Sequence, residues 1–148
     1  MSPEQRALVQ TSWNTISSMG EGVAYIFYQR LFATTPAARD MFAHVDPATQ
    51  VKKLIAALNT VVNGLYELET LVPALTALGK RHVSYGVEDE QYDAAGAALL
   101  WTLETVFGPR WTSDLKLAWS EAYSIVAHVM REAARSPGTN IGGIAATS

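Results

Sequence analysis

Residues 71–87, LVPALTALGKRHVSYGV, decide how the rest of the chain is interpreted. Within them, four residues recur at the spacing of one face of an α-helix: Leu71, Leu75, Leu78 and His82. Gly86 follows and is expected to end the helical segment. His82 therefore falls on a face that is otherwise apolar.

The segments on either side of this stretch are also predicted to be helical. Asp46-Pro47 combines a capping side chain with proline at the first helical position, and an inward face follows it. That face comprises Gln50, Leu54, Ala57, Leu58, Val61 and Leu65. On the other side, Asp89 or Glu90 opens a long helix that Gly108-Pro109 stops.

Similar signals mark the two ends of the chain. Ser2-Pro3-Glu4-Gln5 carries the parts of a capping box, and Gly20 and Gly22 predict a break before a helix at 23–32. A last helix is expected to run to about residue 135, because no glycine or proline interrupts it. Since no window alternates at period two, we predict one all-α domain at 1–135, of about six to eight helices. Residues 136–148 are rich in Gly, Ser and Thr and are predicted to be a flexible tail.

Composition narrows the class of protein. The 148 residues are 49% hydrophobic and 17% charged, which is typical of a globular domain. The net charge of −3 gives no basic surface for nucleic acid. The chain has no cysteine, so disulfides and thiolate chemistry are excluded, and a reducing cytoplasm fits. Neither a signal peptide nor a membrane span is predicted, because the longest uncharged apolar stretch, 55–66, is too short.

The three histidines differ in their surroundings. His128 shares a polar helical face with Glu121, Ser124 and Arg131, and His44 lies in a connection, so both are expected at the surface. His82 lies on an apolar stripe, where a neutral imidazole is a good axial ligand for iron. Taken alone, it would be interpreted first as a core histidine bonded to a backbone carbonyl.

Five fragments, in order, carry a resemblance to a known family. They are FYQRLF at 27–32 followed by Pro36 and Phe42, QVKKL at 50–54, LGKRHVSYGV at 78–87, Tyr92 with GAALL at 96–100, and AWSEAY at 118–123. Over roughly residues 3–134 the sequence resembles the globin family. It is most similar to single-domain bacterial globins, to the globin domain of flavohaemoglobins and to neuroglobin-like proteins.

The resemblance implies a globin fold around one haem b, since covalent attachment would need cysteine. It assigns His82 as the iron ligand, with Tyr28 and Gln50 facing O2, NO or another diatomic ligand. The other haem contacts that it implies are Phe42 on the haem face, Leu54 beside the ligand, Lys53 and Arg81 near the propionates, and Tyr92 on the proximal side.

One position departs from the flavohaemoglobin pattern. In that family a glutamate on the last helix joins a tyrosine beside the proximal histidine. Tyr92 matches the tyrosine, but Ala134 occupies the place of the glutamate, and Glu132 lies on a different helical face. We therefore expect His82 to be a neutral ligand that donates its second N–H to a backbone carbonyl or to water.

Two hydrogen-bond donors in a dry pocket would hold O2 tightly. Tight binding suits the reaction of O2 with nitric oxide, with a separate reductase supplying electrons. The alternative is non-catalytic O2 buffering, delivery or sensing. A helical interaction module without a cofactor is a third, more remote interpretation. The oligomeric state is not predicted.

Overall fold

The computed structural model describes residues 1–84, 87 and 89–135. Its described part contains seven α-helices, two short 3-10 turns and no strand. The helices are α1 (Pro3–Ile16), α2 (Gly20–Thr34), α3 (Pro36–Met41), α4 (Pro47–Gly64), α5 (Leu68–Ser84), α6 (Asp89–Phe107) and α7 (Ser113–Arg135), and the turns are Ser17–Met19 and Gly108–Arg110. The predicted all-α class and number of helices are confirmed, whereas the predicted tail at 136–148 lies outside the described residues.

Helices α1 and α4 begin where local capping signals predict. At α1, the Gln5 backbone N–H donates to Ser2 Oγ at 3.1 Å, and the Ser2 N–H donates to Gln5 Oε1 at 3.0 Å. At α4, Asp46 Oδ2 accepts the Thr49 N–H at 3.1 Å. These bonds satisfy amide groups that have no partner within the helix itself.

The break between the first two helices lies earlier than the sequence predicts. Helix α2 already begins at Gly20, and the chain turns through Ser17–Met19 instead. A Cβ atom at Gly20 would lie 3.3 Å from Ile55 Cδ1 of α4, so the missing side chain allows α2 and α4 to approach closely. The prediction was wrong because it treated this glycine as a helix breaker rather than as a contact between helices.

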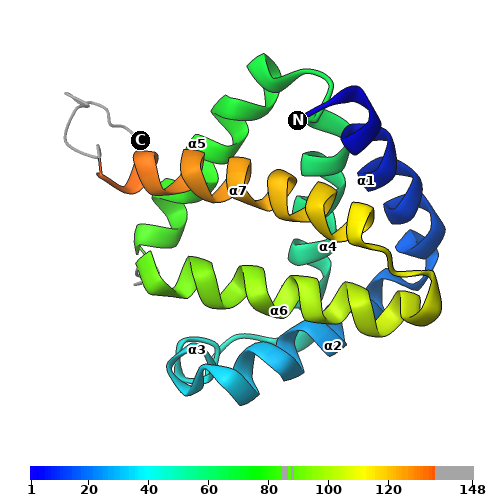
Figure 1. Ribbon diagram of the computed structural model, residues 1–148. Coiled ribbons are helices and arrows are strands. Elements are labelled where there is room, and N and C mark those ends of the chain that lie inside the picture. The colour runs from blue at the N-terminus through cyan, green and yellow to red at the C-terminus, as the bar shows by residue number, and fades with distance from the viewer. Residues whose placement is uncertain (85–86, 88, 136–148) are drawn as a thin grey trace.

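Figure 1 shows the arrangement of the helices. Helices α6 and α7 run antiparallel across the molecule, with α4 behind them in this view, and α2 and α3 lie below α6. Helix α7 packs against α5 and α1, and α2 packs against α6. Helices α2, α4 and α5 therefore surround the centre of the molecule from different sides, with α6 and α7 completing the enclosure.

The core has two parts. The larger part joins α1, α2, α4, α6 and α7, and its most buried side chains include Ile16, Val62 and Leu103. The smaller part is formed by Leu71, Leu75, Tyr92, Ala127 and Met130. The stripe predicted from residues 71–82 is therefore the inner face of α5, and its leucines pack against α6 and α7.

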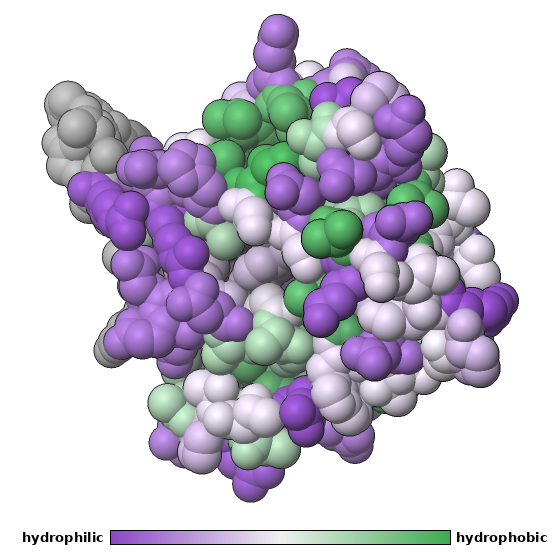
Figure 2. Space-filling view, in the orientation of Figure 1, coloured by the Kyte–Doolittle hydropathy of each residue, from purple (hydrophilic) through white to green (hydrophobic). Residues whose placement is uncertain are grey.

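No helix in the described part of the chain is long and apolar enough to cross a lipid bilayer. On the face shown in Figure 2, hydrophobic surface gathers over α5 where it lies beside α7. Val72 of α5 is 42% exposed in this region.

Helices α5 and α7 approach each other closely at Gly79. A Cβ atom there would lie 2.7 Å from the carbonyl oxygen of Met130. We expect Gly79→Ala to lower the free energy of unfolding by about 1–3 kcal/mol, because the two backbones must separate. Urea denaturation measures this. Gly22→Ala is the control, since no atom lies within 4 Å of its added Cβ, and its stability should equal or slightly exceed the parent's. Parent-like stability of Gly79→Ala would contradict this interpretation of the contact.

Candidate functional site

Tyr28 of α2 lies in a cluster of aromatic rings. Its ring centroid is 5.1 Å from that of Phe27, 5.8 Å from that of Phe32 and 5.6 Å from that of Phe42. Burial raises the pKa of the Tyr28 phenol above its ordinary value, and a hydrogen bond from Gln50 opposes this shift. The phenol therefore keeps its proton at neutral pH and can donate it to a ligand.

Gln50 reaches Tyr28 from the first turns of α4. Its Nε2 donates to Tyr28 Oη at a distance of 3.2 Å. This bond uses the phenol oxygen as an acceptor, and an oxygen that accepts a hydrogen bond is polarised to donate its own proton more strongly. The amide carries two N–H groups, so Gln50 retains the capacity for a second donor contact. The sequence predicted that both side chains face the ligand but missed that they bond to each other.

Two further predicted residues lie beside this pair. Phe42 follows α3 and is half-buried, with its ring against Tyr28. Leu54 lies one helical turn after Gln50 and packs against the same core cluster as Tyr28. The structure therefore brings four of the predicted site residues, from α2, α4 and the segment after α3, into one apolar region.

His82 lies near the end of α5, half-buried on its inner face. Its Nδ1 lies 2.8 Å from the carbonyl oxygen of Leu78, one turn earlier. The tautomer that carries hydrogen on Nδ1 donates to this carbonyl and holds its lone pair on Nε2. Burial lowers the pKa of the imidazole, the Leu78 bond opposes that shift, and the Arg81 charge adds to it. A neutral imidazole with its lone pair on Nε2 is suited to coordinate iron.

Lys53 and Arg81, the two basic residues predicted to lie near the haem propionates, are exposed, unlike the site residues described above. Lys53 lies on α4, beyond the face that carries Gln50 and Leu54, and Arg81 precedes His82 on α5. Haem propionates usually lie at the solvent edge of a site, where such cations can form ion pairs with them. Their role in holding propionates stays a prediction, as does that of the remaining site residues.

Tyr92 of α6 is buried in the smaller core cluster with the leucines of α5. Its phenol oxygen has no hydrogen-bond partner among the described residues. Burial raises the pKa of this phenol, and the guanidinium of Arg131, 5.3 Å from the ring centroid, opposes the shift. A buried hydroxyl without a hydrogen-bond partner lowers the free energy of unfolding, so stability does not explain the position of this phenol.

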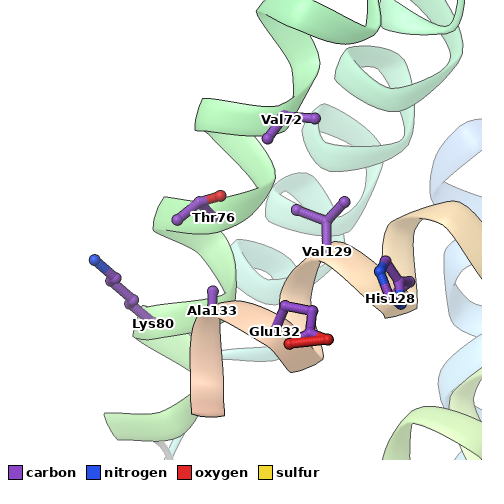
Figure 3. Close-up of a pocket in the computed structure, with 7 residues that line it drawn as sticks. All are labelled: Val72, Thr76, Lys80, His128, Val129, Glu132 and Ala133. Carbon is purple, nitrogen blue, oxygen red and sulfur yellow. The ribbon is translucent and has the colours of Figure 1, made fainter. Parts of the chain in front are cut away.

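Ala134 occupies the place that the resemblance assigns to the flavohaemoglobin glutamate. Ala134 has no hydrogen-bonding side chain, and Glu132 Oε1 lies on the outer surface, 3.9 Å from Arg135 Nη1. Figure 3 shows Glu132 in a groove on the outside of α5 and α7, with Lys80 on the α5 side of the groove and His128 beside it on α7. The predicted departure therefore fits the geometry, and the Leu78 carbonyl oxygen lies within hydrogen-bond distance of His82 Nδ1.

This geometry predicts an iron–histidine bond of ordinary, neutral-imidazole strength. A carbonyl polarises the imidazole N–H less than a carboxylate does, so His82 should donate less electron density to iron. Resonance Raman spectroscopy of the ferrous protein without ligand measures the iron–histidine stretching frequency. We expect the same frequency in Glu132→Gln as in the parent. A frequency in the range of histidine–carboxylate haem peroxidases, lowered by Glu132→Gln, would contradict this assignment.

Taken together, these residues fit a haem. Helix α5 carries a neutral histidine bonded to a backbone carbonyl, while α2, α4 and the segment after α3 bring together an aromatic ring and a protonated phenol held by an amide. An all-α fold with this donor set defines a class of helical haem protein.

Comparisons with known proteins agree with this class. The family model described as Globin matches residues 26–130. The chain belongs to the globin family, and membership implies that it binds haem and, at the haem iron, diatomic gases.

Relatives come from several branches of the family. The chain is 31% identical over 132 residues to a Flavohemoprotein of Bordetella parapertussis, covering 88% of this chain and 33% of that protein. It is 27% identical over 143 residues to Neuroglobin of Danio rerio, covering 88% of this chain and 90% of the relative. It is 29% identical over 136 residues to an Anaerobic nitrite reductase of Oryza sativa subsp. indica, covering 88% of this chain and 94% of that protein. The chain spans about a third of the length of the flavohemoproteins that it matches.

Proposed function

We propose that this chain holds haem b through His82, binds O2 tightly beside Tyr28 and Gln50, and supports the conversion of nitric oxide to nitrate with electrons from a separate reductase. The observation that supports this best is the 3.2 Å hydrogen bond from Gln50 to the Tyr28 phenol. Similarity to the globin part of flavohemoproteins is consistent with the same chemistry.

When bound, haem would supply an iron atom that binds O2 and gives it partial negative charge. The Tyr28 O–H would be the donor toward that oxygen, and Gln50 holds the phenol in place. A hydrogen bond to a charged group contributes about 1.5–3 kcal/mol, so loss of the ligand is slowed by more than tenfold. The rings of Phe32 and Phe42 give the phenol apolar surroundings, in which a hydrogen bond is stronger than in water.

The proposed reaction balances as O2 plus NO plus one electron giving nitrate. The two oxygen atoms of O2 both form part of the product, and NO contributes the third. The electron comes from a reductase, which is a separate protein in this proposal. No proton is consumed, so the task of Tyr28 and Gln50 is to retain O2 until NO arrives.

Two measurements test this function. Absorption spectra of the ferric, ferrous and ferrous–CO forms establish whether haem is bound. NO consumption and nitrate production are then followed with a flavin-containing reductase and its electron donor present. We expect one nitrate for each NO consumed, and the rate should depend on the reductase.

The other interpretations predict different results. A protein that binds O2 but produces no nitrate above a haem-free control would be a carrier, buffer or sensor. A purified protein without a haem absorption band would instead support a helical interaction module.

A further inference from the structure

The stretch 42–50 carries two side chains that contact Tyr28. The ring centroid of Phe42 lies 5.6 Å from that of Tyr28, and Gln50 Nε2 lies 3.2 Å from Tyr28 Oη. Phe42 directly follows α3, whereas Gln50 is the fourth residue of α4. The backbone that joins these two residues therefore determines whether both contacts with Tyr28 form together.

Asp46 holds the start of α4 through two hydrogen bonds from Thr49. Asp46 Oδ2 accepts the Thr49 hydroxyl at 2.7 Å and the Thr49 backbone N–H at 3.1 Å. The carbonyl oxygen of Asp46 also accepts the Gln50 backbone N–H, at 3.0 Å. The bonds from the Thr49 hydroxyl and N–H lower the pKa of the Asp46 carboxyl, so this group is ionised at neutral pH and can accept both.

On the other side of Asp46, a backbone turn leads back to Phe42. The Val45 N–H donates to the Phe42 carbonyl oxygen at 3.1 Å, and the Phe42 N–H donates to the Arg39 carbonyl oxygen of α3 at 3.1 Å. Asp46 lies between this turn and α4, and it is exposed. It therefore joins the segment that carries Phe42 to the helix that carries Gln50.

We propose that Asp46 is a positioning residue, which caps α4 through Thr49 and so keeps Gln50 within hydrogen-bond reach of the Tyr28 phenol. The inference rests on the proposed function, since the pair affects O2 only if it faces the bound ligand. The 3.2 Å between Gln50 Nε2 and Tyr28 Oη is at the long end of the range for a hydrogen bond. A shift of the first turn of α4 by about 0.5 Å would therefore break this bond.

The first turn of a helix depends on such a cap. Its N–H groups have no acceptor within the helix, and helix ends fray. Aspartate and asparagine are about equally good caps, whereas alanine is a poor one. Substitution of Asp46 can therefore either remove the cap or keep it without its charge.

The first test measures O2 dissociation from the haem-loaded protein by stopped-flow mixing. In Asp46→Ala we expect the rate to rise about threefold, less than in Gln50→Leu, because the amide still reaches the phenol part of the time. Asp46→Asn should keep the parent rate, since its side chain can cap α4 without charge. Thr49→Val removes only the hydroxyl bond and should raise the rate by a smaller factor. Dissociation of CO should stay constant in all three variants.

Ser2→Ala is the matched control. Ser2 Oγ caps α1 in the same way, by accepting the Gln5 backbone N–H at 3.1 Å, and α1 carries no residue of the proposed site. Both Ser2→Ala and Asp46→Ala should lower the free energy of unfolding in urea. Only Asp46→Ala should change the O2 dissociation rate, which separates positioning of Gln50 from a general loss of stability.

Two further readouts follow the proposed link from residue 46 to the phenol. In the diamagnetic ferrous–CO form, the Thr49 backbone amide should exchange with solvent faster in Asp46→Ala than in the parent or in Asp46→Asn. In the Tyr28→Phe background, Asp46→Ala should leave the O2 dissociation rate unchanged, because Gln50 then has no phenol to hold.

The outcomes separate the two proposals. A parent-like O2 dissociation rate or parent-like Thr49 exchange in Asp46→Ala would overturn the positioning role while the proposed function stands. It would also be overturned by an equal rise in Ser2→Ala, by a raised rate in Asp46→Asn, or by a rise that persists in the Tyr28→Phe background. Absence of haem in the parent would overturn the proposed function, and the positioning role with it.

Discussion

Replacing His82 with alanine is expected to abolish stable haem retention. The structure holds the ring with a 2.8 Å contact from Nδ1 to the Leu78 carbonyl, which fixes the nitrogen that faces away from the helix. Loss of groups that merely orient a ligand costs about 10–100-fold in metal affinity, so loss of the ligand itself should cost at least about a hundredfold. The haem content of the purified protein and the ferrous–CO spectrum measure the effect.

Two controls separate coordination from folding. His44→Ala and His128→Ala remove exposed histidines and should retain haem like the parent. His82→Gly leaves a space that free imidazole can fill, so added imidazole should restore the haem spectrum. A His82→Ala protein with normal haem content and an unchanged spectrum would disprove the assignment of His82. Failure of imidazole rescue in a folded His82→Gly protein would also count against it.

Sequence alone predicts the parts of this fold that depend on local interactions. The Ser2–Gln5 and Asp46–Thr49 caps each involve residues three positions apart, so their geometry follows from the chain itself. The apolar stripe of α5 is similarly local, because helical periodicity brings Leu71 and Leu75 to one face. The carbonyl that bonds to His82 belongs to Leu78, four residues earlier, and such a partner could be anticipated.

Features that depend on packing between distant segments could not be predicted. Glycine usually breaks a helix, and only the close contact of Gly20 with Ile55 of α4 explains why this glycine lies inside one. Gln50 was placed on an apolar face and Tyr28 was assigned to the ligand site by the family resemblance, but the choice between a ligand contact and a mutual bond depends on side-chain rotamers. Val45 lies outside any helix, so periodicity gave no signal that it lines a crevice together with Tyr28 and Gln50.

The hydrogen bond between Gln50 and Tyr28 changes the effect on O2 binding that is expected from substituting either residue. If Gln50 and Tyr28 acted on O2 independently, the free-energy effects of removing each would add. Because Gln50 donates to the phenol oxygen, its removal also weakens the contact that Tyr28 makes. The two effects should therefore be coupled, and a double-mutant cycle measures the coupling.

We expect Tyr28→Phe to raise the O2 dissociation rate by at least about tenfold, since it removes one hydrogen bond to a charged oxygen. Gln50→Leu should raise the rate by a similar or smaller factor. The double variant Tyr28→Phe/Gln50→Leu should have the O2 dissociation rate of Tyr28→Phe alone, because Gln50 acts through the phenol that both variants lack.

The matched control is Tyr25→Phe, one helical turn away on α2, which removes an exposed hydroxyl and should leave the rate unchanged. Dissociation of CO, which acquires little charge, should change much less than that of O2 in Tyr28→Phe. Stopped-flow displacement measures both rates. Equal rates in the parent and both single variants would show that the pair does not touch the ligand. Strictly additive effects would show instead that Gln50 and Tyr28 contact O2 separately, and that the bond between them breaks when O2 binds.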